Sequence, residues 1–234
     1  MNFPSMRPAI MIAAAGLLAA CASGPSHLRT PEGWQVQALP GKSITQYRST
    51  TKDGRVVIEA RAERSASLLR RKLTPPEVTP TEVVFSWRVD ALMPQASVAD
   101  AEVEDAAARV VFGFDGDRSR LSGRNRALFD LAETLTGEAP PFATLMYVWD
   151  PALPVDTVVV NPRTDRIRKI VVVSGTQHLG RWREHRRNLA EDYRRAFGEE
   201  PGALVSVAKM TDSDNTRSQA KAWYGAVTWA TPGR

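Results

Sequence analysis

The chain has 234 residues and contains little cysteine, histidine or aromatic residue. It has one cysteine, three histidines and 7% aromatic residues. A single cysteine excludes an internal disulfide and any cysteine-rich zinc or iron–sulfur site, so a packed core must stabilise the fold. The net charge of +5 is spread along the chain, without the basic block that is typical of nucleic-acid-binding proteins. With 43% hydrophobic and 24% charged residues, the composition is that of an ordinary globular protein.

The common catalytic signatures are also missing. The sequence has no Gly-x-Ser-x-Gly nucleophile elbow, no Walker A loop and no Gly-x-Gly-x-x-Gly motif. The histidines, His27, His178 and His185, form no His-x-x-x-His pair, which argues against a catalytic zinc. Carboxylates remain as the candidate acid–base groups.

The amino terminus is typical of a signal peptide over residues 1–20. Arg7 precedes an uncharged apolar run from Pro8 to Ala20, and a run of about a dozen residues is too short to span a bilayer as a helix, which takes about 20. The run ends in Leu-Ala-Ala-Cys at positions 18–21, which resembles the lipobox of bacterial lipoproteins. The alternative is cleavage at an Ala-x-Ala-like site, which would leave Cys21 as an unused thiol.

On the lipoprotein interpretation, Cys21 carries lipid and becomes the first residue of the mature chain. Three acyl chains would hold it more firmly than the reversible contact of a single chain. Ala22 follows the cysteine in place of aspartate, and in the lipoproteins that this sequence resembles this favours the outer membrane. Residues 21–33 then form the acylated end and a flexible tether. We therefore expect an outer-membrane lipoprotein that faces the periplasm.

From Trp34 to the end, residues 34–234, the pattern predicts one mainly antiparallel β-sandwich. The clearest hairpin joins Ser43–Thr50 to Arg55–Ala62 through Asp53-Gly54, which favours a tight turn. Further strands are predicted at Glu82–Val89, Ala107–Phe114, Ala143–Trp149, Thr157–Val160, Ile167–Val173, Leu204–Thr211 and Lys221–Trp229.

Two helices are predicted to cover the sandwich. In Gly123–Thr136, an apolar stripe of Leu128, Leu131, Ala132 and Leu135 recurs at helical spacing, and Gly137 ends the helix. The second helix is predicted over Gly180–Phe197. Its arginines, Arg183, Arg187 and Arg194, indicate a solvated charged flank more than an anion site.

One acidic cluster invites a comparison with calcium sites. Asp212-Ser-Asp214-Asn215-Thr216 offers alternating oxygen ligands, but it lacks the glycine and the terminal glutamate of an EF-hand loop. The favoured interpretation is a turn whose side chains bind their own backbone amides. No cofactor is expected.

Aromatic residues near the predicted strand ends suggest sugar stacking, although most of them should lie in the core. The main candidates are Trp87, Trp149 and Tyr224. Because neighbouring residues of a strand point to opposite faces, Trp223 and Tyr224 cannot share one core.

Six motifs follow one another along the mature chain. They are Ser86–Asp90, Glu104–Val110, Tyr147–Trp149, Arg187–Asn188 with Asp192–Tyr193 and Phe197–Gly198, Thr211–Thr216, and Ala222–Gly225. In this order they resemble the DUF3047 family of uncharacterised exported bacterial proteins. The family often has Gly-Asp where this chain has Gly225-Ala226. The resemblance implies an envelope location and a sandwich similar to galactose-binding-like jelly rolls, and it implies no established activity.

The leading hypothesis is a non-catalytic module that binds a carbohydrate or another envelope polymer. Its candidate ligand-binding residues are Trp87, Arg88, Asp105, Arg109, Trp149, Asp212, Asp214, Asn215 and Tyr224. One alternative is an enzyme that acts on envelope polysaccharide through a carboxylate pair, since two carboxylates at a suitable separation can hydrolyse glycosides. That pair would come from Asp90, Asp105, Asp212 and Asp214. The other alternative is a scaffolding lipoprotein whose helix Gly180–Phe197 docks a protein partner.

Overall fold

The structure, a computed structural model, describes residues 31–79 and 82–229. The predicted signal peptide, Cys21 and most of the tether lie outside the described residues. Among those described, no helix combines the length and the apolar character that crossing a membrane requires.

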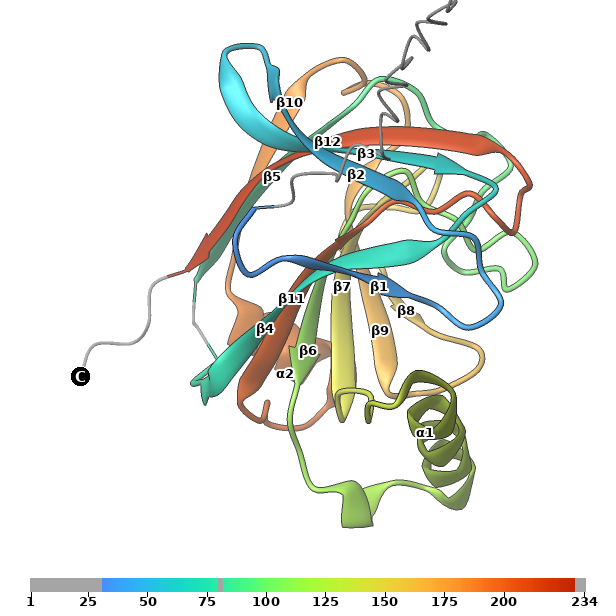
Figure 1. The fold of residues 1–234 in the computed structure, drawn as a ribbon, viewed down its shortest axis with the longest axis vertical. Helices are drawn as coiled ribbons and strands as arrows, with labels where there is room; N and C mark the ends of the chain where they lie inside the picture. Colours follow the sequence, from blue (N-terminus) through green and yellow to red (C-terminus); the bar gives the residue numbers. More distant parts are fainter. Residues whose placement is uncertain (1–30, 80–81, 230–234) are drawn as a thin grey trace, which may run out of the picture.

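Two β-sheets pack face to face and form the predicted antiparallel sandwich of jelly-roll type (Figure 1). The seven-stranded sheet has the order β1 (Gln35–Ala38), β4 (Ser67–Glu77), β11 (Leu204–Met210), β6 (Arg109–Phe114), β7 (Ala143–Asp150), β9 (Ile167–Ser174) and β8 (Val158–Val160). The five-stranded sheet has the order β10 (Trp182–Arg187), β5 (Val83–Val89), β12 (Gln219–Trp229), β3 (Arg55–Glu63) and β2 (Gln46–Lys52). The neighbouring strands are antiparallel except for β7 and β9, which run parallel.

The core lies between the sheets and is rich in aromatic rings. Phe85 of the five-stranded sheet stacks on Tyr147 of the seven-stranded sheet, with ring centroids 5.3 Å apart. Phe112 meets the same tyrosine edge-on at 5.8 Å. Each of the predicted strands is present, and β1, β4 and β10 formed without being predicted. Long-range packing of rings therefore replaces the disulfides that the sequence lacks.

The predicted hairpin is β2 and β3, joined at Asp53 and Gly54. Both turn residues have positive φ, 52° and 74°, which is the geometry that favours Asp-Gly. Ile58 packs in the core, whereas Val56 near the turn is 81% exposed. The hairpin tip lies against the outer face of the five-stranded sheet, where Asp53 accepts a hydrogen bond from Arg88 at 2.8 Å.

The first helix, α1 (Gly123–Thr136), has the predicted bounds, but its orientation was wrongly predicted. Ser122 accepts a hydrogen bond from the Asn125 amide at the amino end, and Gly137 ends the helix in the left-handed region. Phe129 and Asn125 are buried. Leu128, Leu131 and Leu135 are 36%, 55% and 60% exposed.

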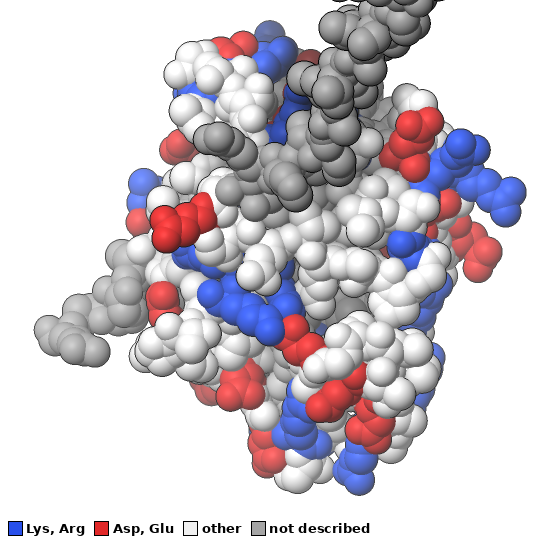
Figure 2. Space-filling model, viewed as in Figure 1, with Lys and Arg blue, Asp and Glu red and all other residues white. Residues whose placement is uncertain are grey.

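The orientation of α1 has a polar cause. The Asn125 side chain donates to Asp165 at 2.5 Å and accepts from Thr164 at 2.8 Å. These bonds tie one face of the helix to the segment before β9 and turn the leucines outward. Figure 2 shows charged side chains of both signs gathered around this end of the molecule.

The second predicted helix was wrong in its amino-terminal half. Trp182–Arg187 is the strand β10, paired antiparallel with β5, and the helix α2 spans only Leu189–Phe197. Asn188 sets the boundary, because its side chain accepts from the Glu191 amide as an N-cap. Arg183 and Arg187 therefore lie on a strand and Arg194 on the helix.

The rotation of α1 can be tested by paired substitutions. Phe129→Ala should lower the free energy of unfolding by about 3 kcal/mol, because it removes a buried ring. Leu131→Ala should change it by less than about 0.5 kcal/mol, since its side chain is mostly solvated. Urea unfolding measures both. Equal losses would contradict the orientation described.

Candidate functional site

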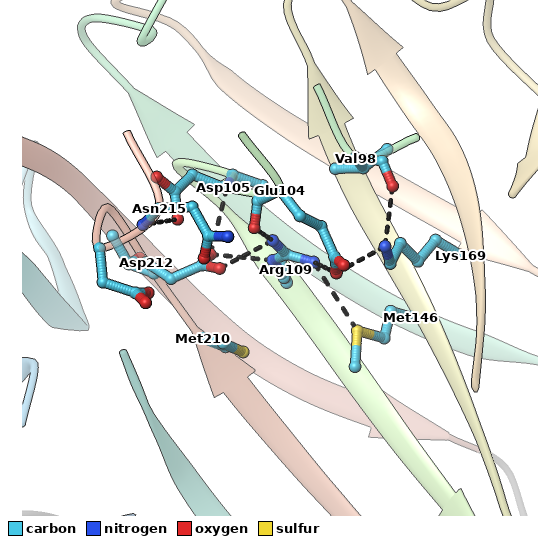
Figure 3. Close-up of polar contacts among 12 residues, drawn as sticks. Val98, Glu104, Asp105, Arg109, Met146, Lys169, Met210, Asp212 and Asn215 are labelled. Atoms are coloured by element: carbon cyan, nitrogen blue, oxygen red, sulfur yellow. Dashed lines mark hydrogen bonds and ion pairs between the residues drawn. The ribbon is translucent and has the colours of Figure 1, made fainter. Parts of the chain in front are cut away.

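Five of the predicted ligand-binding residues converge where β6 begins and β11 ends (Figure 3). Their centre is a buried ion pair, with Arg109 1% and Asp212 3% exposed. Arg109 Nε and Nη2 donate to the two carboxylate oxygens of Asp212 at 2.9 and 2.8 Å. This two-pronged geometry is the strongest form of such a pair.

A second cation and a second acid extend the pair across the sheet. Arg109 Nη2 also donates to the Glu104 carbonyl at 3.1 Å. Lys169 Nζ lies 2.5 Å from the Glu104 carboxylate and donates to the Val98 carbonyl at 2.7 Å. Burial lowers the pKa of Lys169 to about 8, and repulsion from Arg109 adds to that effect. Burial raises the pKa of Asp212 to about 6, against the opposing influence of Arg109.

The remaining three residues, Asp105, Asp214 and Asn215, hold a turn together. Asp105 accepts from the Thr216 amide at 2.7 Å and from its hydroxyl at 2.6 Å. Asn215 donates to the Ala101 carbonyl at 2.9 Å, and Asp214 pairs with Lys42. Carboxylate oxygens of Asp105, Asp212 and Asp214 lie within 4.8 Å of one another. A cation placed among them would have to displace these hydrogen bonds and ion pairs.

The three predicted aromatic ligand residues lie in the core. Trp87, Trp149 and Tyr224 are each 0% exposed. Trp149 donates to the Gly175 carbonyl at 3.0 Å, and the Tyr224 hydroxyl donates to the Met210 carbonyl at 2.5 Å. The polar atoms of Trp149 and Tyr224 thus bond to the protein's own backbone, whereas Trp87 Nε1 is buried without a partner among the described residues.

The carboxylates considered for catalysis are all engaged. Asp90 accepts from Arg88 at 2.8 Å. Asp105 is bound by Thr216, Asp212 by Arg109, and Asp214 by Lys42. Each of the four is therefore bound by a cation or by a hydroxyl group, and Asp90 also lines the cavity beside Trp223 that is described below.

Arg88 lies apart from the cluster, on the outer face of the five-stranded sheet. There it belongs to a cross-strand line that we name the tryptophan row. On neighbouring strands, Trp182 lies opposite Arg88, Arg88 lies opposite Trp223, Trp223 lies opposite Glu59, and Glu59 lies opposite Arg48. The row thus crosses β10, β5, β12, β3 and β2. Sequence reasoning put Trp223 and Tyr224 on opposite faces, and this is confirmed, with Tyr224 in the core.

Polar contacts fix both indole rings of the row. Trp223 Nε1 donates to Glu59 at 3.1 Å, and Trp182 Nε1 donates to Asp53 at 2.8 Å. Lys221 and Lys52 place their ammonium groups 4.4 and 4.5 Å from the Trp223 ring centre, within the range of cation–π attraction. Trp223 is consequently 4% exposed.

A cavity of about 670 Å³ adjoins Trp223 on this face. Its walls carry amide, carboxylate and cationic side chains, namely Gln46, Arg61, Glu63, Asp90, Gln219 and Lys221. This is the chemistry that hydroxyl-rich ligands require, with one aromatic wall.

The opposite sheet has a groove of different character. It measures about 340 Å³, and Arg109 and Asp212 are among the residues that line it. Its floor includes Val111, Ala208 and Met210, and no aromatic ring lines it among the described residues. The tryptophan row with its adjoining cavity is therefore the better candidate for a sugar.

Comparison with protein families identifies the chain. The profile described as "Protein of unknown function (DUF3047)" matches residues 32–228. The chain belongs to the DUF3047 family. No curated protein matches it.

Solved structures show only distant likeness to this DUF3047 protein. The family 11 carbohydrate-binding module of the cellulase Lic26A-Cel5E of Clostridium thermocellum is 7% identical, with a TM-score of 0.40 over 86% of this chain and 88% of the other. The family 11 xylanase from Neocallimastix patriciarum is 10% identical, with a TM-score of 0.38 over 88% of this chain and 95% of the other. The xyloglucanase domain of NopAA from Sinorhizobium fredii, solved in complex with cellobiose, is 8% identical, with a TM-score of 0.41 over 84% of this chain and 93% of the other. These values are too low to transfer a site or an activity.

The buried ion pair can be tested by removing one partner and then both. Arg109→Met should lower the free energy of unfolding by about 3–5 kcal/mol, because Asp212 is left buried without its cation. Adding Asp212→Asn to that variant should recover part of the loss. Urea unfolding of both single variants and the double variant measures the coupling. Strictly additive losses would show that the two side chains do not act as a pair.

Proposed function

We propose that this protein is an exported bacterial lipoprotein that binds an envelope glycan without chemical change, using the outer face of its five-stranded sheet. The observation that supports this most is the tryptophan row beside a polar cavity of about 670 Å³. Sugar rings have an apolar face that stacks on indole, while their hydroxyls exchange hydrogen bonds with amides and charged groups.

The positive charges of the two lysines that contact the Trp223 ring affect which kind of glycan this face would bind. Lys52 and Lys221 contact the ring from the surface, and Lys221 is only 3.8 Å from Glu59, a loose ion pair. Surface contacts of this kind contribute little stability, so a sugar can displace them at small cost. Cations outnumber acids along the row and its cavity, which favours a glycan that carries negative charge.

The proposed location follows from Cys21. If lipid is attached there, residues 22–33 reach at most about 40 Å when fully extended. The sandwich would then stay close to the outer membrane on its periplasmic side, within reach of glycans of the envelope.

Glycan binding should depend on the rings of the row. Trp182→Ala and Trp223→Ala should each weaken binding to isolated peptidoglycan or lipopolysaccharide at least tenfold, equivalent to about 1.4 kcal/mol. Trp229→Ala is the matched control, since Trp229 lies on β12 and packs against the core side. Pull-down with quantified bound fraction measures all three. No binding by the folded parent protein, or unchanged binding by both row variants, would contradict the proposal.

Membrane attachment should depend on one sulfur atom. Cys21→Ser should move the protein from the membrane fraction to the soluble fraction and abolish incorporation of labelled palmitate, because the hydroxyl is not acylated. Ser26→Ala, in the same tether, should change neither. A labelled, membrane-bound Cys21→Ser variant would contradict lipidation at this residue.

A further inference from the structure

Two cations point into the sandwich from the seven-stranded sheet. Arg71 on β4 pairs in register with Val207, and Lys209 on β11 pairs with Leu69 and Val110. All three apolar partners belong to the main core. Because cross-strand partners share a face, Arg71 and Lys209 occupy inward-facing positions where apolar side chains are the rule.

Neither cation has an acidic partner among residues 31–79 and 82–229. The neighbours Arg70 and Lys72, which face outward, both pair with Glu138. Arg71 Nε is buried and has no hydrogen-bond acceptor in the described part of the chain. Lys209 is 4% exposed, and burial together with repulsion from Arg71 lowers its pKa to about 8.

Both cations line a cavity of about 240 Å³. Trp34 forms one wall, with Lys209 Nζ 4.7 Å and the Arg71 guanidinium 5.7 Å from its ring centre. Ser49 adds a hydroxyl, and the largely exposed Val56 lies at the rim, so the cavity opens to solvent near the β2–β3 hairpin.

We propose that this cavity binds a phosphate dianion, free or as the monoester of a small molecule. Lys209 is buried and Arg71 is half-buried with its Nε enclosed, and neither has an acidic partner in the described part of the chain. Removing such charges from water is costly, and a dianion between them would offset that cost. A guanidinium and an ammonium donate strong charge-assisted hydrogen bonds to phosphate oxygens. The small volume fits a phosphate group with at most a small substituent and excludes a polymer chain.

This site lies between the sheets, whereas the tryptophan row lies outside the five-stranded sheet. If a variant loses glycan binding, its phosphate binding can therefore still be measured, and the reverse also holds.

Thermal unfolding of the mature chain tests the proposal, with inorganic phosphate, glucose 1-phosphate, acetate, glucose and chloride compared at pH 7 and equal ionic strength. Phosphate should raise the Tm by several degrees relative to chloride, and acetate should raise it less because a single negative charge balances only one cation. A larger shift with glucose 1-phosphate than with phosphate would identify an ester as the ligand, and the reverse would identify the free ion. Glucose should have no effect.

The substitution Lys209→Met should raise the Tm in chloride, because it removes a buried charge, and should weaken phosphate binding at least tenfold by calorimetry. Lys72→Met, on the outward side of the same strand pair, should leave phosphate binding unchanged. If Lys209→Met fails to fold, Lys209→Gln serves in its place. Equal stabilisation by phosphate and chloride, equal stabilisation by phosphate and acetate, or full phosphate binding after loss of the Lys209 charge would each overturn the proposal.

Discussion

The buried pair of Arg109 and Asp212 is the constraint on which one end of the sandwich depends. Arg109 begins β6 and Asp212 follows β11. Arg109 donates to the Glu104 carbonyl and Asp212 accepts from the Ala106 amide, so the pair fixes this segment. A charge at this depth is tolerated only while its partner stays in place. The segment from Val98 to Asp105 and the turn at Asp212–Thr216 are thereby held in one geometry, although they are more than a hundred residues apart.

Local signals in the sequence predicted most of the fold. Alternating β-branched residues marked the principal strands, Asp53-Gly54 marked the hairpin, and Gly137 marked the end of α1. Failures arose where a tertiary contact outweighed the periodicity. The leucine stripe of α1 has helical spacing, yet Asn125 and its bonds to Asp165 and Thr164 decide which side faces the sheet. In β10, the alternation of arginines with other residues is also compatible with the charged face of a helix. Only the pairing with β5 shows that this segment is a strand and not a helix.

The candidate site could be predicted only in fragments. The acidic turn and Arg109 were identified, because clustered charges are visible in a linear sequence. Of the tryptophan row only Arg88 was among the predicted ligand-binding residues. The row as a whole could not be assembled from the sequence, because its members come from five strands and meet only through the strand pairing. One useful signal was available, namely the opposite orientation of Trp223 and Tyr224. Likewise, Arg71 stands between Arg70 and Lys72 in the sequence and looks like part of an exposed basic stretch, whereas its strand position turns it inward.

Strand β10 forms one edge of the five-stranded sheet, and within residues 31–79 and 82–229 no further strand pairs with its outer side. An open edge can pair with the edge of another molecule and seed aggregation. Here the edge carries four charged residues, Arg183, Glu184, Arg186 and Arg187, and charged side chains are a common protection of an edge strand. For a protein whose proposed lipid anchor would crowd many copies onto one membrane surface, charged side chains along this edge would disfavour the joining of sheets between neighbouring molecules.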